Sequence, residues 1–217
     1  MGNHNGRKPR RMTPEPDHAG AIENALNRLG SELSPNLTYH NLWHTEQVVL
    51  PAVVRLARLQ EIPEINIKRI EVAAAFHDIG FIVTYQGHEL AGIELANQVL
   101  PGYGFPPEII EQVSGLVLAT RLPQNPQNLL EEILADADLD VLGRDDFFEQ
   151  NDALYREILA FGNPVNRLQW LEGQVKFISG HEYFTAAART TRGFQEKQYL
   201  AVLEERLSQV IVSGGIR

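Results

Sequence analysis

The chain contains 217 residues, of which 43% are hydrophobic and 22% are charged. This length and composition suit one globular domain with a sizeable core and argue against wholesale disorder. The formal net charge of −9 argues against a general nucleic-acid-binding protein. Because the chain has no cysteine, disulfides and thiolate metal sites are excluded, and His, Asp and Glu remain as the strong metal ligands.

The N-terminal residues carry no sign of a leader or an anchor. Residues 1–20 lack the apolar region of a secretory signal, and no apolar run is long enough to span a bilayer. Together with the absence of cysteine, this favours a cytoplasmic protein that does not bind membranes. Residues 1–20 are expected to form a disordered tail, which could contact phosphate or an acidic surface, but a solvated terminus is the simpler interpretation. The basic residues of this tail are Arg7, Lys8, Arg10 and Arg11.

From residue 21 to residue 217 the sequence predicts a single all-helical domain. Apolar residues recur at helical spacing, and Gly and Pro separate the segments. Alternation of β-branched residues between turn residues is nearly absent, so we expect no sheet. Pro51 falls inside the second segment and should kink or end that helix near Leu50. The predicted helices are Ala21–Leu33, Trp43–Leu59, Ile67–Phe76, Glu89–Leu100, Pro107–Ala119, Asn128–Leu142, Phe147–Phe161, Val165–Ile178 and Tyr183–Val212.

Two short motifs contain histidines with metal-ligand spacing. In Tyr39-His40-Asn41-Leu42-Trp43-His44, His40 and His44 would lie one turn apart on one face of a helix. The second motif, His77-Asp78-Ile79-Gly80, closes the third predicted helix. Successive helical side chains diverge by about 100°, so adjacent His and Asp residues serve one ion most easily where a helix ends, and Gly80 supplies a flexible exit. Taken alone, each motif is more simply interpreted as a satisfied histidine or a surface pair.

Three aspartates alternate in Asp136-Ala137-Asp138-Leu139-Asp140. In a continuous helix Asp138 would share the apolar stripe of Leu134 and Leu142. A carboxylate there is costly unless a cation or hydrogen bonds compensate it. Asp138 is therefore the predicted metal ligand, with helix capping or a salt bridge as the alternative. Asp136 and Asp140 would lie together on another side, either solvated or supporting the ligands.

Other polar residues are weaker candidates for the site. His88 opens the fourth predicted helix and can approach the site as a supporting or second-metal residue. Arg121 and Arg144 are candidates for binding phosphate through their planar donor fork, although each is equally well explained as a surface residue. His181 can reach the pocket, although a polar residue at a helix start is the simpler interpretation. The neighbour of His88, Glu89, is explained by the helix dipole alone.

The order His44, then His77-Asp78, then Asp138 resembles the HD superfamily of metal-dependent phosphohydrolases, over roughly residues 36–161. The resemblance implies an HD-domain bundle of about eight to nine helices in which these four residues bind a divalent cation. The C-terminal helices over residues 164–213 lie outside the shared core. Tyr39-His40-Asn41 is also similar to the cyclic-nucleotide phosphodiesterase branch, in which the histidine at the position of His40 protonates the leaving oxygen.

The resemblance also implies the nature of the cofactor. Two imidazoles and two carboxylates suit Mn²⁺, Fe²⁺, Zn²⁺, Co²⁺ or, less well, Mg²⁺. Asp78 could both bind this ion and orient the attacking water. Members with two metals carry further histidines after the helix that follows His88, and residues 120–124 contain none. We therefore expect one divalent ion, and the missing histidines put a second metal in doubt and weaken the likeness to phosphodiesterases.

These observations predict an enzyme that hydrolyses a phosphate ester, with a nucleotide as the favoured class of small-molecule substrate. The sequence does not separate phosphodiesters from phosphomonoesters, although His40 as a proton donor favours the diester slightly. The alternative is a metal-binding sensor or interaction module with weak or no catalysis, which the missing later histidines favour. Retention of all four ligands together with His40 favours the enzyme. A homo-oligomer remains open.

Overall fold

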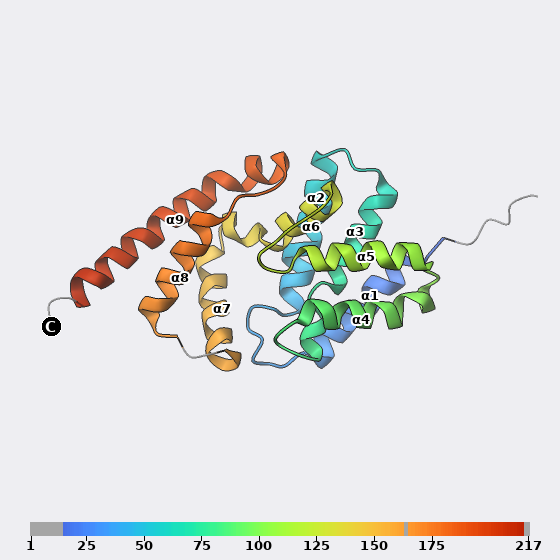
Figure 1. Cartoon of the computed structure of the whole chain (residues 1–217), viewed down its shortest axis with the longest axis horizontal. Helices are drawn as coiled ribbons and strands as arrows, with labels where there is room; N and C mark the ends of the chain where they lie inside the picture. The colour runs from blue at the N-terminus through green and yellow to red at the C-terminus, as the bar shows by residue number, and fades with distance from the viewer. Residues whose placement is uncertain (1–14, 163–164, 215–217) are drawn as a thin grey trace, which may run out of the picture.

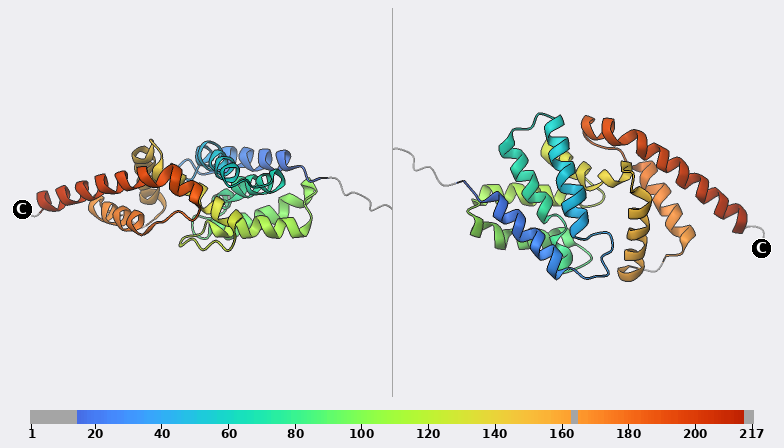
Figure 2. Two further views of the ribbon diagram at one scale, coloured as in Figure 1. Left: turned by 90° about the horizontal axis from the view of Figure 1, so that it is seen from above. Right: turned by 180° about the vertical axis from the view of Figure 1, so that it is seen from behind.

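The computed structural model describes residues 15–162 and 165–214, and these form a helical molecule (Figures 1 and 2). Over this range there are nine α-helices and no strand, which confirms the predicted all-helical fold. The α-helices are α1 (His18–Glu32), α2 (Leu50–Leu59), α3 (Glu64–Phe76), α4 (His88–Val99), α5 (Pro107–Ala119), α6 (Leu129–Asp138), α7 (Phe147–Phe161), α8 (Arg167–Gly180) and α9 (Ala186–Gly214). Shorter helical segments connect some of them: the π-helix η1 (His44–Val49) and the 3₁₀ turns η2 (Ile79–Ile82), η3 (Leu100–Tyr103) and η4 (Asp140–Gly143).

Two helices differ from their predicted course. The α-helical part of the second segment begins at Leu50, with Pro51 in its first turn and the π-helix η1 before it. The backbone stays helical at Val49 and Leu50, so Pro51 does not end the helix, and the change from π- to α-helical hydrogen bonding falls directly before it. The helix predicted to reach Leu142 ends at Asp138, and the chain continues as the tighter turn η4. Asp140 therefore does not belong to the helix that carries Asp138.

The ends of the chain bear on two further expectations. Helix α1 begins at His18, inside the predicted tail, and residues 1–14 with their basic cluster lie outside the described residues. The division into a tail and a single domain over residues 21–217 stays a prediction. None of the described helices is long and apolar enough to cross a membrane.

Helix α3 forms the centre of the bundle made by α1 to α6. It contacts α1, α2 and α5, and its residues 72–76 are fully buried. Burying this uninterrupted apolar run is the main driving force that fixes α3 in the interior. His77 directly follows this buried run at the end of α3, and it is therefore completely buried as well.

Helices α7, α8 and α9 lie together on one side of that bundle, and α9 extends along the edge of the molecule (Figures 1 and 2). Helix α9 packs on α8 and on η4. Its Arg192 donates to both oxygens of Asp140, at 2.8 and 2.9 Å, and Arg55 of α2 pairs with the same carboxylate. A Cβ atom on Gly143 would lie 2.6 Å from the Arg192 carbonyl oxygen, so glycine is required for this close approach. The C-terminal helices are thus joined to the segment that directly follows α6.

Candidate metal centre and the cavity beside it

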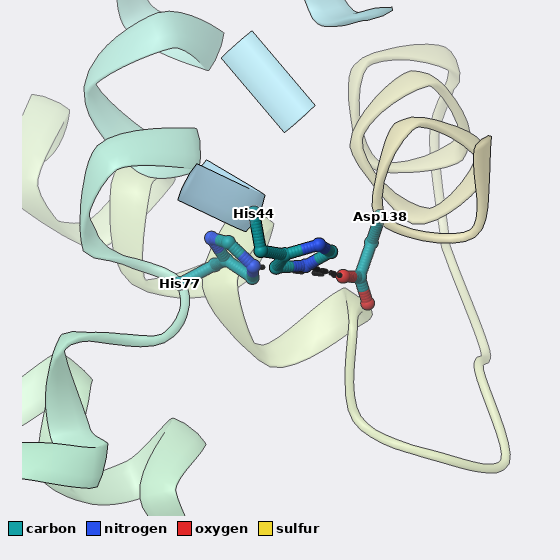
Figure 3. Close-up of side chains that lie close together, drawn as sticks. All are labelled: His44, His77 and Asp138. Atoms are coloured by element: carbon teal, nitrogen blue, oxygen red, sulfur yellow. Dashed lines mark hydrogen bonds and ion pairs between the residues drawn. The ribbon is translucent and has the colours of Figure 1, made fainter. Parts of the chain in front are cut away.

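Side chains from three separate elements converge inside the molecule: His44 at the start of η1, His77 after α3, and Asp138 at the end of α6 (Figure 3). One ligand atom from each lies within 4.8 Å of the other two. The Asp138 Oδ1 atom is 3.2 Å from His44 Nε2 and 3.5 Å from His77 Nε2. Both histidines are buried, whereas the Asp138 side chain is 18% exposed. The result is a compact group of two imidazoles and one carboxylate with access from one side.

Asp78 adjoins this group. Its Oδ2 atom lies 3.1 Å from His77 Nε2 and 3.7 Å from His44 Nε2. The backbone has left helical geometry at Asp78, where φ is −104° and ψ is 0°. Adjacent side chains diverge within a helix, so the end of α3 at this point lets His77 and Asp78 reach the same region. The structure thereby brings together all four residues proposed as ligands from the sequence.

Gly80 contributes in a different way from the expected flexible exit. A Cβ atom at this position would lie 1.8 Å from the carbonyl oxygen of His88 and 2.6 Å from the backbone nitrogen of Gly92. Glycine is therefore needed because α4 packs directly against the backbone here, which brings His88 at the start of α4 close to Asp78.

The orientation of His77 is fixed by its backbone. Its Nδ1 atom is 2.6 Å from the carbonyl oxygen of Ala74, and since a carbonyl can only accept, Nδ1 donates. The Nε2 atom then faces the carboxylates. Both His77 Nε2 and Asp78 Oδ2 are buried without a hydrogen-bond partner in the described part of the chain. Unsatisfied buried polar atoms are costly and rare, so this pair of atoms fits a site that a cation completes. The hydrogen bond from Nδ1 to Ala74 would hold the histidine ring, as the second ring nitrogen of a ligating histidine is held in other metal sites.

The charges of the site point to the same conclusion. Burial opposes a charged imidazolium at His77, but the neighbouring carboxylates of Asp78 and Asp138 together outweigh this effect and raise the pKa of His77 well above its usual value. Burial also opposes the charged carboxylate of Asp138, yet the hydrogen bond to His44 and the positive charge of the nearby His77 lower its pKa to about 2. The acids thus stay ionised, and protons on histidine balance them. A divalent ion would replace those protons, which is how metal binding couples to pH.

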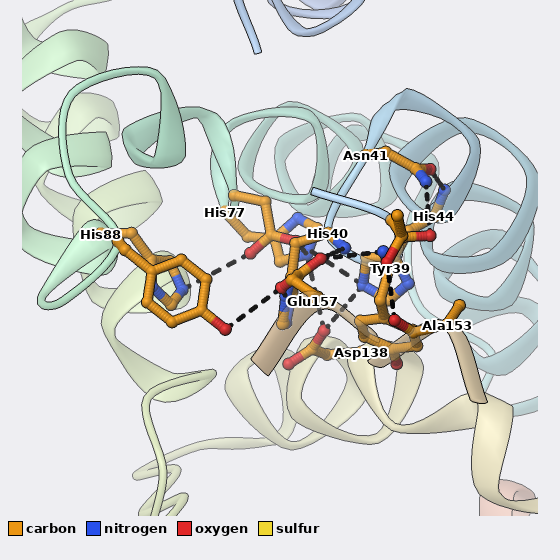
Figure 4. A network of polar contacts seen from close by, with 12 residues as sticks. Tyr39, His40, Asn41, His44, His77, His88, Asp138, Ala153 and Glu157 are labelled. Carbon is orange, nitrogen blue, oxygen red and sulfur yellow. Dashed lines mark hydrogen bonds and ion pairs between the residues drawn. The ribbon is translucent and has the colours of Figure 1, made fainter. Parts of the chain in front are cut away.

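His40 lies beside this centre, held by a buried carboxylate (Figure 4). The side chain of Glu157, on α7, is completely buried. One of its oxygens lies 2.5 Å from His40 Nδ1, and the other accepts from the backbone N–H groups of Tyr39 and His40 at 2.8 and 3.0 Å. The ring centroids of His40 and His44 are 6.0 Å apart. Although His40 precedes the helix that contains His44, it faces the same site because Glu157 fixes both its ring and its backbone.

Phe81, in η2, packs against both His40 and His88, whose own ring centroids are 6.2 Å apart. The rings of His40 and Phe81 stack with centroids 4.6 Å apart, and those of Phe81 and His88 stack at 3.8 Å. The Nε2 atom of His88 lies 3.6 Å from Asp78 Oδ1. His88 is therefore adjacent to the candidate metal centre but is not part of its compact group of ligand atoms.

The two aspartates that flank Asp138 have structural partners instead of solvent. Asp136 is buried and accepts from the backbone N–H groups of Phe184 and Thr185, each at 2.8 Å, directly before α9. Asp140 is buried by its pairs with Arg192 and Arg55. Neither is solvated, which the sequence left open. Both anchor the C-terminal helices to the segment that carries Asp138.

Two further candidates from the sequence lie away from the cavity. Arg144 pairs with Asp146, with its Nε atom 2.8 Å from the carboxylate, and lies over the ring of Trp43. His181 pairs through Nδ1 with the buried Glu196 of α9. Arg121, by contrast, lines the cavity described next.

A cavity of about 540 Å³ opens from the candidate metal centre toward α7 and α8. Its lining includes His40, Asp78 and Asp138 and, from α8, Trp170 and Phe177. This volume falls within the range of about 300–1,000 Å³ that is typical of small-molecule sites. A substrate bound at the metal centre therefore has room to extend between α7 and α8.

Replacing Asp136 with asparagine is expected to destabilise the fold without removing metal. Each Asp136 oxygen accepts one backbone N–H. Asparagine would replace one of these oxygens with an NH₂ group, which cannot accept a hydrogen bond from the backbone N–H that it faces. We expect the free energy of unfolding to fall by about 1–3 kcal/mol, the usual cost of an unsatisfied buried group. Denaturant unfolding measures this loss, and elemental analysis should find unchanged metal.

The matched change Asp138→Asn should have the opposite effect, with metal lost and stability little reduced. If Asp136→Asn removed the metal and Asp138→Asn retained it, the assignment of the two aspartates would be wrong.

Residues 49–140 match the family model of the HD domain. The fold is similar to the 1.45 Å crystal structure of a predicted HD superfamily hydrolase from an uncultured Thermotogales bacterium, with a TM-score of 0.58 and 19% sequence identity. This likeness covers 89% of the present chain and 93% of the other. No curated protein matches the chain. Residues 49–140 therefore match an HD domain, and the fold of the chain is similar to that of the Thermotogales protein.

The matched segment contains His77, Asp78 and Asp138, whereas His40 and His44 precede it and Glu157 follows it. Glu157 was not identified from the sequence. It lies four residues after the buried Ala153, on the inward face of α7. A glutamate at such a position is a signal of the kind used for Asp138, since a buried carboxylate requires a partner.

Proposed function

We propose that this chain is a metal-dependent phosphohydrolase that hydrolyses a phosphate ester of a nucleotide. The observation that carries the proposal is the position of His40, a candidate proton donor, beside the ligand group of His44, His77 and Asp138 at one cavity. A purely structural metal site would need the ligands, but it would not need His40 and the buried carboxylate of Glu157 that holds it. The family and the fold support a metal-dependent hydrolase in general.

His44, His77, Asp78 and Asp138 would hold one divalent ion. When bound, such an ion offsets negative charge on a phosphoryl group and makes water more acidic. Asp78 has a carboxylate with one oxygen toward the histidines and the other toward His88, and it borders the cavity. These contacts support the proposal that Asp78 orients a water molecule for attack on phosphorus.

His40 would donate the proton to the leaving oxygen. Burial disfavours its charged form, but the hydrogen bond to Glu157 and the charge of Asp78 outweigh burial and raise the pKa of His40. The imidazolium is therefore populated to higher pH than in an ordinary histidine, as an acid catalyst requires. A hydrogen bond from Nδ1 to Glu157 also fixes the ring so that Nε2 is the nitrogen free to act.

Replacing Glu157 with glutamine should shift the pH profile of turnover. A proton donor acts only when protonated, so activity falls as pH rises through the pKa of His40. Removing the carboxylate lowers that pKa, because the hydrogen bond and charge of Glu157 both raise it. The alkaline limb of the profile of kcat against pH should therefore move to lower pH, with metal content unchanged.

A lower activity with an unshifted alkaline limb would assign Glu157 a structural role only. Replacing Tyr85 with phenylalanine is the control, since its hydroxyl donates to the same carboxylate at 3.3 Å while the carboxylate itself remains. The alkaline limb should stay nearly in place in that variant.

The choice between phosphodiester and phosphomonoester substrates follows from a substrate screen. The protein loaded with Mn²⁺ is incubated with cyclic nucleotides, nucleoside monophosphates and simple alkyl phosphates, and released product is measured. We expect hydrolysis of at least one nucleotide ester, and turnover of cyclic nucleotides would favour the diester that His40 suggests. Absence of any hydrolysis by protein that has bound its metal would favour the alternative, a metal-binding sensor module.

A further inference from the structure

The side of the cavity that is lined by α7 and α8 is largely apolar and aromatic. Both helices lie outside the segment that matches the HD domain. Leu154 and Ile158 line it from α7, and Trp170 and Phe177 line it from α8. Trp170 is only 6% exposed. Aromatic walls of this kind favour a flat, uncharged group that leaves water on binding.

The charges on the cavity wall argue against a polyphosphate. Among its lining residues Arg121 is the only arginine or lysine, whereas Asp78, Glu89 and Asp138 are acidic. The histidines and the metal ligands serve the reacting phosphoryl group. Additional phosphates would therefore meet a single exposed arginine in a largely apolar space, and burying unpaired charges is costly. One phosphoryl group is what this cavity can neutralise.

Three amide side chains, those of Gln150, Asn151 and Gln174, also line the cavity. Asn151 donates to Gln174 Oε1 at 2.5 Å and accepts from Trp170 Nε1 at 3.1 Å. The Oε1 atom of Gln174 is therefore already paired, whereas its Nε2 group makes no hydrogen bond within the described residues. Gln150 also lines the cavity, and its side chain makes no hydrogen bond there either. Neutral donors and acceptors on an aromatic wall are suited to an uncharged heteroaromatic group.

We propose that the wall formed by α7 and α8 binds a neutral aromatic group of the substrate, and that the substrate carries a single phosphoryl group. This inference rests on the proposed hydrolysis and deepens it, because it selects monophosphate esters over nucleoside di- and triphosphates. The residues that carry the selection are Trp170, Gln174 and Phe177, together with Gly173, which lines the same wall and has no side chain to occupy it.

Gly173 allows the cavity to be filled from within α8. A Cβ atom added there meets nothing within 4 Å, and leucine favours a helix more than glycine does, so Gly173→Leu is expected to fold. Gly180, on the same helix, also has nothing within 4 Å of an added Cβ but does not line the cavity. Gly180→Leu is therefore the matched control.

The first measurement is binding of phosphate-free probes, which requires no catalysis. Trp43→Phe leaves Trp170 as the single tryptophan, and its fluorescence is followed during titration with adenosine and, separately, phenol. We expect saturable changes in the parent and in Gly180→Leu, with affinity reduced at least tenfold in Gly173→Leu. Gln174→Leu should weaken adenosine but not phenol, which separates a heteroaromatic base from a plain aromatic ring. Equal binding by Gly173→Leu and the parent would overturn the proposal.

The second measurement compares turnover of adenosine monophosphate, adenosine triphosphate and methyl phosphate by the Mn²⁺-loaded protein. We expect kcat/KM to be at least tenfold higher for the monophosphate than for the triphosphate. Gly173→Leu should raise the KM for the monophosphate and leave methyl phosphate unchanged. Hydrolysis of the triphosphate at an equal or higher rate, or an equal effect on both monoesters, would refute the inference while leaving the proposed hydrolysis intact. Loss of all hydrolysis with adenosine binding retained would refute the proposed function alone and support the aromatic wall.

Discussion

Replacing His77 with alanine is expected to abolish metal binding and with it phosphoester hydrolysis. His77 is fully buried, its Nδ1 atom donates to the carbonyl oxygen of Ala74, and its Nε2 atom faces Asp78 and Asp138 without a hydrogen-bond partner among the described residues. Removing it takes away one of the two imidazoles of the ligand group, together with the positive charge that it holds beside Asp78 and Asp138. Purified wild-type protein should contain one tightly held divalent ion per chain by elemental analysis, and the variant should contain none.

The control for this variant is His181→Ala, which removes another histidine with a buried side chain. His181 pairs with Glu196 and does not line the cavity, so its removal should lower stability while metal content stays at one ion per chain. If His77→Ala kept its metal, or if His181→Ala lost it as well, the ion would be held elsewhere in the chain.

Replacing His40 with alanine is expected to reduce turnover of alkyl or ribose phosphoesters by about 10²–10⁴-fold, the usual contribution of a positioned proton donor. Metal content should not change, because His40 is held by Glu157 and is not part of the compact ligand group. The loss should be much smaller for p-nitrophenyl esters, since a good leaving group needs little protonation in the transition state. Steady-state rates on the two ester types measure the difference.

An equal loss of turnover on both ester types would contradict proton donation by His40. The histidine would then position substrate or support the fold. Loss of the metal ion in His40→Ala would instead show that His40 contributes to holding the ion.

The helices were predictable because their signals are local. Apolar periodicity and Gly or Pro punctuation identified every α-helix of the described chain, and Asp138 was selected because a carboxylate among apolar residues needs a partner. The details that failed depend on contacts between distant segments. Asp136 and Asp140 were expected on another side of one long helix, but that helix ends at Asp138.

Glu157 shows why the rest of the site was harder to infer. It is 117 residues from His40 in sequence, and it contacts His40 only because α7 folds back against the loop before η1. One buried glutamate on a helix is a weak signal until its partner is known. The aromatic wall of α8 is similar, since Trp170 and Phe177 could not be distinguished from ordinary core residues before the cavity was seen.

The most direct test of metal-dependent hydrolysis is a titration of chelator-treated protein with Mn²⁺ while turnover of a nucleotide ester is followed. The account predicts that activity is absent without metal, rises in proportion to added metal, and reaches most of its maximum at one equivalent per chain. Activity that is unaffected by complete removal of metal, or that is absent at every metal loading despite bound ion, would contradict it.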